Sequence, residues 1–357
     1  MSTQIGFIGL GVMGGPMARN LASKFPGIRV FDTDPVKIQR LVKGAEEFAQ
    51  RQGPVSGARG SATLEAGTPG PTSRDVASRQ PTLNEATPGG ASTREATTGE
   101  AATRKAAVLP ASSAAEIGSS CDIVILSLPT SEVVKTVVLG EGGLGRVMKK
   151  GSILIDTSTT EVGITKEIAT ALSQQGIHFL DAPVSGGEKA AIEATLSFMV
   201  GGDPTVFETC KPYLSAMGAS VVRLGEAGMG QVAKCVNQMI VGATFAVIAE
   251  SFALGAKAGL DPKVLYDAIK GGWAGSKLLD VAARDMFSRE FKPGGTVDIH
   301  WKDLGYALSV AKAEDVPTPL TALTHEIFKA ARAAGDGKRS QPAVVRLWER
   351  LLGIEVK

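Results

Sequence analysis

Short apolar runs alternate with helix-like stretches through the first part of the chain. Helical patterns over residues 16–24 and 35–43 separate runs that are largely uninterrupted by polar side chains. Such runs are typical of strands buried on both faces of a parallel sheet, with helices as the crossovers. They lie at residues 5–10, 29–32, 106–109, 122–128, 152–156, 178–184 and 197–202. The pattern therefore predicts a doubly wound α/β sheet.

The strand pattern stops near residue 228, and only helical patterns follow. The first is a long helix from about Gln231, in which almost every residue is apolar or small. Further helices are predicted at 262–270, 276–288, 301–313, 319–334 and 341–352. We therefore expect two domains, an α/β domain over residues 1–226 and an all-helical domain over residues 227–357.

One segment breaks the pattern of the first domain. Residues 51–106 contain no aromatic residue, Ile or Met, and TLEAGTPGPTSRD at 63–75 returns imperfectly as TLNEATPGGASTRE at 82–95. A segment with so little to bury cannot offset the entropy lost on ordering. We predict that residues 51–106 are a disordered insertion, with an interaction arm as the alternative.

Composition narrows the possible partners and the compartment. The 38 basic and 36 acidic residues give a net charge of +2, which favours neither a nucleic acid nor a membrane surface as partner. The apolar run at 239–249 is shorter than the roughly 18–20 residues that a bilayer requires. Three widely spaced cysteines and a chain that enters a strand almost at once favour a cytoplasmic protein with reduced thiols. No spacing of residues indicates a metal site.

A glycine-rich motif links the first predicted strand to the first predicted helix. It is G-x-G-x-x-G, and Asp32 ends the next strand. Such a turn lets a pyrophosphate reach the amides at a helix N-terminus, while the carboxylate accepts hydrogen bonds from ribose hydroxyls and repels a 2′-phosphate. Because Thr33 beside Asp32 adds no positive charge, we predict a Rossmann-type domain that binds NAD, with NADP possible. The expected contacts here and at the later strand end SLPTS are Gly9, Leu10, Gly11, Met13, Gly14, Asp32, Leu128 and Pro129.

A second glycine motif, DAPVSGGEKAA at 181–191, follows a predicted strand. Its Ser-Gly-Gly sequence has two readings that spacing alone leaves open. Consecutive amides and a hydroxyl could form a small nest for a carboxylate. An ordinary glycine turn would have the same sequence.

Lys234 stands almost alone among the apolar residues of the long helix. Helical spacing places Asn237 and Gln238 on its face, and two glycines precede it in GMGQVAKCVNQ. A lysine that extends from a helix end to solvent is the simpler explanation. The glycines and the polar cluster favour a partly buried lysine instead, whose lowered pKa suits proton transfer beside a nicotinamide.

Four segments together identify a family resemblance. GFIGLGVMG, DAPVSGG, GMGQVAKCVNQ and HWKDL, in this order and spacing, resemble the β-hydroxyacid dehydrogenase family over the whole chain except residues 51–106. One departure is that Ala194 precedes Thr195 where the family usually has glycine. The added methyl group matters only if that backbone needs a positive φ.

The resemblance implies a role for several residues. Lys234 matches the catalytic lysine, and Thr159 matches a cofactor contact. Lys302 in HWKDL, followed by Asp303, implies a lysine that reaches the cofactor from the helical domain, although the dipeptide alone would suit a solvated surface. The implied substrate-binding residues are Ser185, Gly186, Gly187 and Asn237. His300 is expected to be structural.

The resemblance also implies an activity. It is reduction of a short hydroxy-acid semialdehyde, first of all 2-hydroxy-3-oxopropionate to glycerate, without a metal. The alternatives are a 3-hydroxyisobutyrate dehydrogenase and a glyoxylate/succinic semialdehyde reductase. A homo-oligomer formed through the helical domain is also implied. The more distant alternative is a non-catalytic protein that kept the dinucleotide fold and uses residues 51–106 as its arm.

Overall fold

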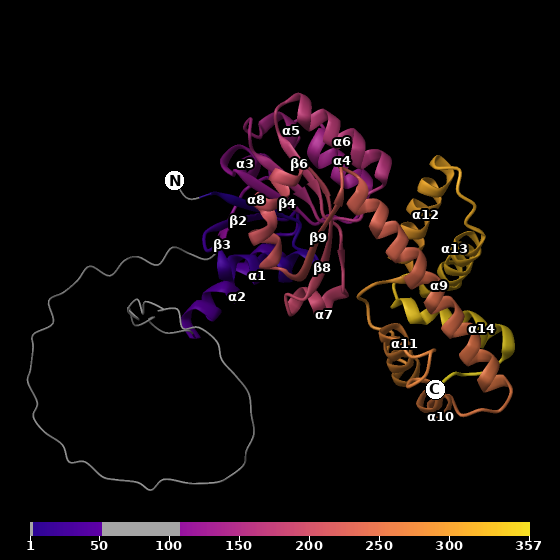
Figure 1. Ribbon diagram of the computed structural model, residues 1–357. Helices are drawn as coiled ribbons and strands as arrows, with labels where there is room; N and C mark the ends of the chain where they lie inside the picture. The colour runs from indigo at the N-terminus through magenta and orange to yellow at the C-terminus, as the bar shows by residue number, and fades with distance from the viewer. Residues whose placement is uncertain (1–2, 52–107) are drawn as a thin grey trace, which may run out of the picture. The chain divides into compact units, whose positions relative to one another are not determined.

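The computed structural model describes residues 3–51 and 108–357. Apart from Arg51, which ends a helix, the segment predicted to be a disordered insertion lies outside the described residues. Within the described part, a sheet with flanking helices is followed by a region of helices alone, as Figure 1 shows.

The sheet has nine strands in the described residues, in the order β3-β2-β1-β4-β5-β6-β8-β7, with β9 paired to β8. Strands β1 to β6 pair in parallel, whereas β8 is antiparallel to β6 and β7 and parallel to β9. Their bounds are β1 Ile5–Ile8, β2 Ile28–Phe31, β3 Val108–Pro110, β4 Ile123–Leu126, β5 Ile153–Asp156, β6 His178–Asp181, β7 Val184–Ser185, β8 Leu196–Gly202 and β9 Gly218–Gly225. The predicted doubly wound sheet is confirmed.

Both faces of the sheet are buried, as the continuous apolar runs indicate. Phe7 and Ile125 belong to one hydrophobic cluster, and Val124 and Leu126 belong to another on the opposite face. Side chains alternate between the faces of a strand, so every position of β4 needs an apolar residue. The helices of this region are α1 Gly14–Lys24, α2 Pro35–Arg51, α3 Ala114–Ser120, α4 Ser131–Leu139, α5 Leu144–Val147, α6 Val162–Gln174, α7 Gly187–Ile192 and α8 Pro204–Ser215.

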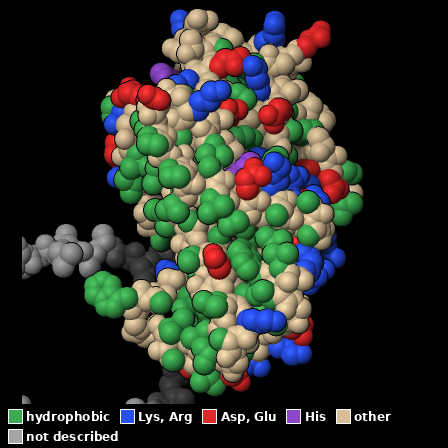
Figure 2. Space-filling view, turned by 90° about the vertical axis from the view of Figure 1, so that its right-hand side faces the viewer, with side chains coloured by type: hydrophobic (Ala, Val, Ile, Leu, Met, Phe, Trp, Pro, Cys, Tyr) green, Lys and Arg blue, Asp and Glu red, His purple; other side chains and the backbone are tan. Residues whose placement is uncertain are grey.

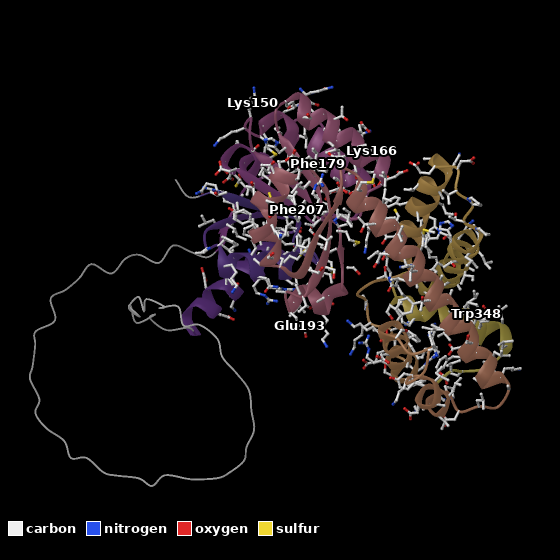
Figure 3. The ribbon with its side chains drawn as sticks, in the orientation of Figure 1. Lys150, Lys166, Phe179, Glu193, Phe207 and Trp348 are labelled. Carbon is white, nitrogen blue, oxygen red and sulfur yellow. The ribbon has the colours of Figure 1, made fainter. Side chains whose placement is uncertain are left out.

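The helical region has its own hydrophobic core. Phe245, Phe252, Leu304 and Phe328 are buried together there. Figure 3 shows Trp348, which packs against this core, and Phe207, which belongs to a core of the sheet. The elements are α9 Met229–Lys257, α10 Pro262–Ile269, α11 Lys277–Ser288, α12 Val297–Ala313, α13 Pro319–Ala331, the π turn η1 Arg332–Asp336, the 3₁₀ turn η2 Gln341–Val344 and α14 Val345–Leu352.

Several boundaries differ from the prediction, most of all the end of α2, which runs to Arg51 and not to Lys43. Helix α12 starts at Val297, four residues before the predicted start, because the Thr296 side chain accepts a hydrogen bond from the Ile299 amide and caps the helix there. The segment predicted as one helix over 341–352 begins with a 3₁₀ turn instead. The predicted domain boundary between residues 226 and 227 falls in the connection from β9 to α9, which lie in one compact unit. That division stays a prediction.

Helix α9 is longer than its strictly apolar run. Among the described residues it is the one helix that could cross a membrane by length and composition. Core helices of soluble proteins meet the same two criteria. Because α9 packs against α11, α12, α13 and α14, one side of it, which includes Phe245 and Phe252, belongs to the core of the helical region.

Candidate active site

The glycine motif has the shape that a dinucleotide requires. Gly9 has φ of 93°, a conformation that residues with a side chain rarely adopt, and a Cβ on Gly14 would collide with the Gly9 carbonyl. A Cβ on Gly11, in contrast, would meet no atom within 4 Å. The space beside Gly11 is therefore open, and the start of α1 has no side-chain cap at Met13. A helix N-terminus without a side-chain cap, beside open space, fits a pyrophosphate group.

Asp32 lies directly after β2 and contacts the glycine motif. Its carboxylate accepts hydrogen bonds from the Leu10 amide at 2.7 Å and the Asp34 amide at 2.8 Å. Lys37 of α2 places its ammonium 3.3 Å from the same carboxylate. Partial burial acts to raise the pKa of Asp32, but these hydrogen bonds and Lys37 together hold it below the usual value. Lys37 was not predicted from the sequence; it lies in the first turn of α2, close enough for its ammonium to reach the carboxylate.

The segments that follow β4 and β5 are joined to each other, and both contact helix α12. Leu128, followed by Pro129, donates its amide hydrogen to the Ser158 hydroxyl at 2.8 Å. Lys302 on α12 donates to the Thr159 carbonyl at 3.3 Å, and the Ser131 amide donates to the Tyr306 hydroxyl at 3.4 Å. Thr159 and Lys302 were named from the sequence as cofactor contacts, which stays a prediction. Tyr306 was not named, although its position one turn after Lys302 is a signal that could have indicated it.

Lys234 is buried in the middle of this site. Only 8% of the residue is exposed, and its ammonium donates to the Val184 carbonyl at 2.8 Å and to Gln238 Oε1 at 3.3 Å. Burial lowers the pKa of Lys234; the charge of Asp303 acts against this, and that of Lys302 adds to it. The alternative of a lysine that extends to solvent is therefore wrong.

The Ser-Gly-Gly loop meets the lysine through Asn237. Ser185 donates its hydroxyl hydrogen to Asn237 Oδ1 at 3.3 Å, and Asn237 Nδ2 donates to Gln238 Oε1 at 2.8 Å. Gly186 and Gly187 have φ of 136° and 70°, so each needs glycine at its position. Ser185 and Asn237 are thus linked to Lys234 through Gln238, and Gly186 and Gly187 follow Ser185 in the chain.

Ala194 lies in the turn that leads back to β8. Its φ is 55°, in the left-handed region that disfavours any side chain. Because the backbone has a positive φ at this position, the methyl group of alanine, which the glycine usual in the family lacks, adds strain.

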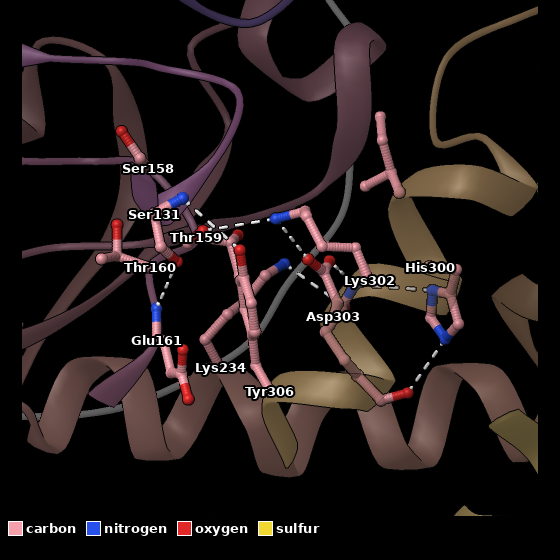
Figure 4. A network of polar contacts seen from close by, with 12 residues as sticks. Ser131, Ser158, Thr159, Thr160, Glu161, Lys234, His300, Lys302, Asp303 and Tyr306 are labelled. Carbon is pink, nitrogen blue, oxygen red and sulfur yellow. Dashed lines mark hydrogen bonds and ion pairs between the residues drawn. The ribbon is translucent and has the colours of Figure 1, made fainter. Parts of the chain in front are cut away.

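Gln238 joins Lys234 to a second group of polar side chains, shown in Figure 4. Its Nε2 donates to Asp303 Oδ2 at 2.6 Å, and Asp303 Oδ1 lies 3.0 Å from the Lys302 ammonium. His300 Nε2 lies 3.1 Å from the Gln238 carbonyl, which can only accept, so this nitrogen carries the hydrogen. Burial lowers the pKa of His300 to about 4, so the ring is neutral at pH 7.

Two buried carboxylates lie at the ends of neighbouring strands. Asp156 ends β5, and Asp181 ends β6 beside it. Burial raises the pKa of both, to about 6 for Asp156, whose carboxylate accepts from the Ser158 amide and the Thr160 hydroxyl. Neither was predicted from the sequence, although an acidic residue at the end of a buried strand is a visible signal. Within the described ranges, no group of three His, Cys, Asp or Glu side chains could hold a metal ion.

The arrangement is suited to moving a hydride and a proton at one carbon. A dinucleotide loop, a possible carboxylate-binding loop and a buried lysine with a lowered pKa converge on the carboxyl ends of the strands. An open α/β sheet binds its ligands at that edge.

Two families match the chain in turn. The family described as the NAD binding domain of 6-phosphogluconate dehydrogenase matches residues 4–85 and 90–225. The family described as NAD-binding of NADP-dependent 3-hydroxyisobutyrate dehydrogenase matches residues 228–348.

Curated relatives and solved structures agree with these matches. The chain is 31% identical to 2-(hydroxymethyl)glutarate dehydrogenase of Eubacterium barkeri, over 99% of this chain and 98% of that protein. It is also 31% identical to 2-hydroxy-3-oxopropionate reductase of Escherichia coli, over 97% of each. The structure of 3-hydroxyisobutyrate dehydrogenase from Salmonella typhimurium superposes with a TM-score of 0.73 at 25% identity, covering 97% of this chain and 100% of that one.

Proposed function

The chain belongs to the β-hydroxyacid dehydrogenase family, and we propose that it reduces a short hydroxy-acid semialdehyde with NADH. Members of the family are NAD(P)-dependent enzymes that act on CH–OH groups. The observation that carries the proposal is the buried Lys234 ammonium, which shares Gln238 with Asn237 while Asn237 contacts Ser185. A proton donor and a substrate-binding loop are therefore adjacent.

Lys234 is the acid of the proposed reduction. A nicotinamide cofactor held at the glycine motif and Asp32 would supply the hydride for the aldehyde carbon. As negative charge grows on the aldehyde oxygen, the Lys234 ammonium stabilises it and then donates a proton to it. In the oxidation direction, neutral Lys234 removes the hydroxyl proton. Hydrogen bonds to Val184 and Gln238 hold its Nζ in place in either direction.

The Ser-Gly-Gly loop is the proposed binding site for the substrate carboxylate. Ser185 offers a hydroxyl, and the amides of Gly186 and Gly187 follow it. Asn237 lies between this hydroxyl and Gln238, and is in place to hold the substrate beside the lysine. Fixing the carboxylate orients the aldehyde, and orientation supplies part of the rate.

We propose 2-hydroxy-3-oxopropionate as the first substrate, with glycerate as the product. Support comes from the name of the Escherichia coli relative. 3-Hydroxyisobutyrate, glyoxylate and succinic semialdehyde are the alternatives, and the Eubacterium relative adds 2-(hydroxymethyl)glutarate in the oxidation direction. The test is NADH oxidation or NAD⁺ reduction by purified protein across this panel. If another compound has the higher kcat/KM, the substrate assignment is overturned and the family-level function is kept.

A non-catalytic dinucleotide-binding protein is the more distant alternative. It would need neither a buried lysine nor a substrate loop in contact with it. Both are present, so catalysis is the better supported function. Absence of turnover with every member of the panel, despite NADH binding, would favour the alternative.

We also propose that the protein is a cytoplasmic homo-oligomer joined through its helical region. Helix α9 exposes Val236, Ile240, Val247 and Leu254, with 51, 62, 55 and 69% of each residue exposed. Their spacing of four and seven residues places them along one side of the helix, as in helices that pack against another helix. Figure 2 shows hydrophobic side chains gathered on one face of the helical region.

The oligomer is tested by sedimentation of wild type and two variants. Val247→Glu should dissociate it, whereas Val36→Glu on α2, at a valine that is 56% exposed, should not. A monomeric wild type would overturn the proposal.

Cys121, Cys210 and Cys235 are unpaired and buried, which supports a reducing compartment. Cell fractionation tests the location.

A further inference from the structure

We propose that Gln231 is a positioning residue that holds the loop after β5 at a fixed distance from Lys234. The inference rests on the proposed function, because it concerns how Lys234 is placed relative to the cofactor. It assigns a role to a residue that is itself not among the expected cofactor or substrate contacts, but whose side chain bonds the two neighbours of one of them, Thr159.

Gln231 joins helix α9 to the loop between β5 and α6. The residue is fully buried, with 0% exposed. Its side chain donates from Nε2 to the Ser158 carbonyl at 2.8 Å and accepts at Oε1 from the Thr160 amide at 3.1 Å. The two bonds flank Thr159, the expected cofactor contact. An amide is the group that can accept at one end and donate at the other, so glutamine suits the position.

The first turn of α9 is also held by Asp181 at the end of β6. Asp181 accepts from the Gly228 amide at 2.7 Å and from the Gln231 amide at 2.9 Å. A Cβ on Gly230 would lie 2.8 Å from the Asp181 carbonyl, so α9 approaches the end of β6 as closely as glycine allows. The first turn of α9 therefore cannot move without breaking these contacts.

Lys234 follows Gln231 by three residues on this helix, a rise of about 4.5 Å. From the opposite side, Lys302 of α12 donates to the Thr159 carbonyl at 3.3 Å. Thr159 is thus held between α9, through the two Gln231 bonds to its neighbours, and α12, through Lys302. The distance from Lys234 to that loop is set by the Gln231 side chain.

Replacing Gln231 with Leu tests the role with a side chain of similar size. The variant leaves the Ser158 carbonyl and the Thr160 amide without partners, so the loop can shift relative to Lys234. We expect kcat to fall at least about tenfold, the scale for misplacing a proton-transfer group. The dissociation constant of NADH should stay within about threefold, because Asp32 and the glycine motif remain.

Replacing Gln231 with Glu gives a pH signature that loss of stability alone would not produce. An ionised carboxylate only accepts and would face the Ser158 carbonyl, whereas a protonated one can donate to that carbonyl and accept from the Thr160 amide. Burial and the nearby carboxylates of Asp156 and Asp181 favour the protonated form. The charges of Lys234 on the same helix and of Lys302 on α12 act against it. We expect kcat relative to wild type to rise at least about threefold from pH 8.5 to pH 6.

Hydrogen exchange gives a readout without turnover. In the Gln231→Leu variant, the Thr160 amide should exchange faster, whereas the matched control Gln174→Leu, at an exposed glutamine that ends α6, should leave exchange and kcat unchanged. Full activity of Gln231→Leu, or a pH-independent ratio for Gln231→Glu, would overturn the inference. If Lys234→Ala is fully active, the proposed function fails instead.

Discussion

Replacing Asp32 with Ser should change the cofactor preference without any added positive charge. Asp32 repels the 2′-phosphate of NADPH, and it also holds the Lys37 ammonium at 3.3 Å. Removal of the carboxylate therefore ends a repulsion and frees a cation at the same position. A variant designed from the sequence alone would also change Thr33 to Arg to supply a cation.

The size of the effect follows from charges about 4 Å apart. Their interaction is worth about 1 kcal/mol in water and about 4 kcal/mol at the effective dielectric constant of about 20 that is typical near a protein surface. Asp34 lies 3.9 Å from Lys37 and keeps part of its charge engaged, so the lower half of that range applies. That half runs from about 1 to about 2.5 kcal/mol, so at 1.4 kcal/mol per factor of ten we expect the ratio of kcat/KM for NADPH to that for NADH to rise roughly five- to sixtyfold.

Initial rates with both cofactors measure this ratio. In the Asp32→Ser background, Lys37→Ala should reverse part of the gain, while Lys43→Ala, at an exposed lysine on the same helix, should not. An unchanged ratio in Asp32→Ser would refute the electrostatic argument. A wild type that already prefers NADPH widely would show that Lys37 outweighs Asp32.

Four further outcomes are expected. Lys234→Ala should lower kcat at least about 10²-fold with near-normal NADH binding in a fluorescence titration, and near-normal turnover would contradict the assignment. Wild-type kcat for reduction should fall as the pH rises through the lowered pKa of Lys234, since the ammonium is the acid; the pH profile should break below 10.5, the usual pKa of a lysine. Ala194→Gly should raise stability by up to about 1 kcal/mol in urea unfolding, because relief of left-handed strain exceeds the added freedom of the unfolded chain. Asp156→Asn should raise Tm at pH 8 but little at pH 4, because the raised pKa of Asp156 costs stability as the pH rises from the unfolded value towards about 6; an equal shift at both pH values would contradict this.

The parts of the fold that depend on short-range pattern could be predicted from the sequence. The glycine motif and Asp32 lie within one βαβ unit, and Lys234, Asn237 and Gln238 share a face because of helical spacing alone. Strand β9 was missed because it is a partly exposed edge strand whose sequence, GASVVRLG, contains no long apolar run.

The contacts that complete the site could not be predicted, because they join distant segments. Gln238 and Asp303 are 65 residues apart, and Gln231 and Ser158 are 73 apart. No local periodicity reports which residues of α12 face α9. The Lys37–Asp32 pair is close in sequence, but its geometry depends on how α2 leaves β2, which propensities do not specify.

The hydrogen bonds around Lys234 also determine when its proton can be replaced. Val184 offers a carbonyl and Gln238 an amide, and neither group can pass a proton to the lysine. The carboxylate of Asp303 lies behind the Gln238 amide, so it is insulated from Lys234 as a proton source. Because neither hydrogen-bond partner of Lys234 among the described residues is a proton source, we expect the lysine to be recharged from the solvent through the substrate side. Each turnover then takes up its proton only after the product alcohol has left, and proton uptake measured with a pH indicator should follow product release in time.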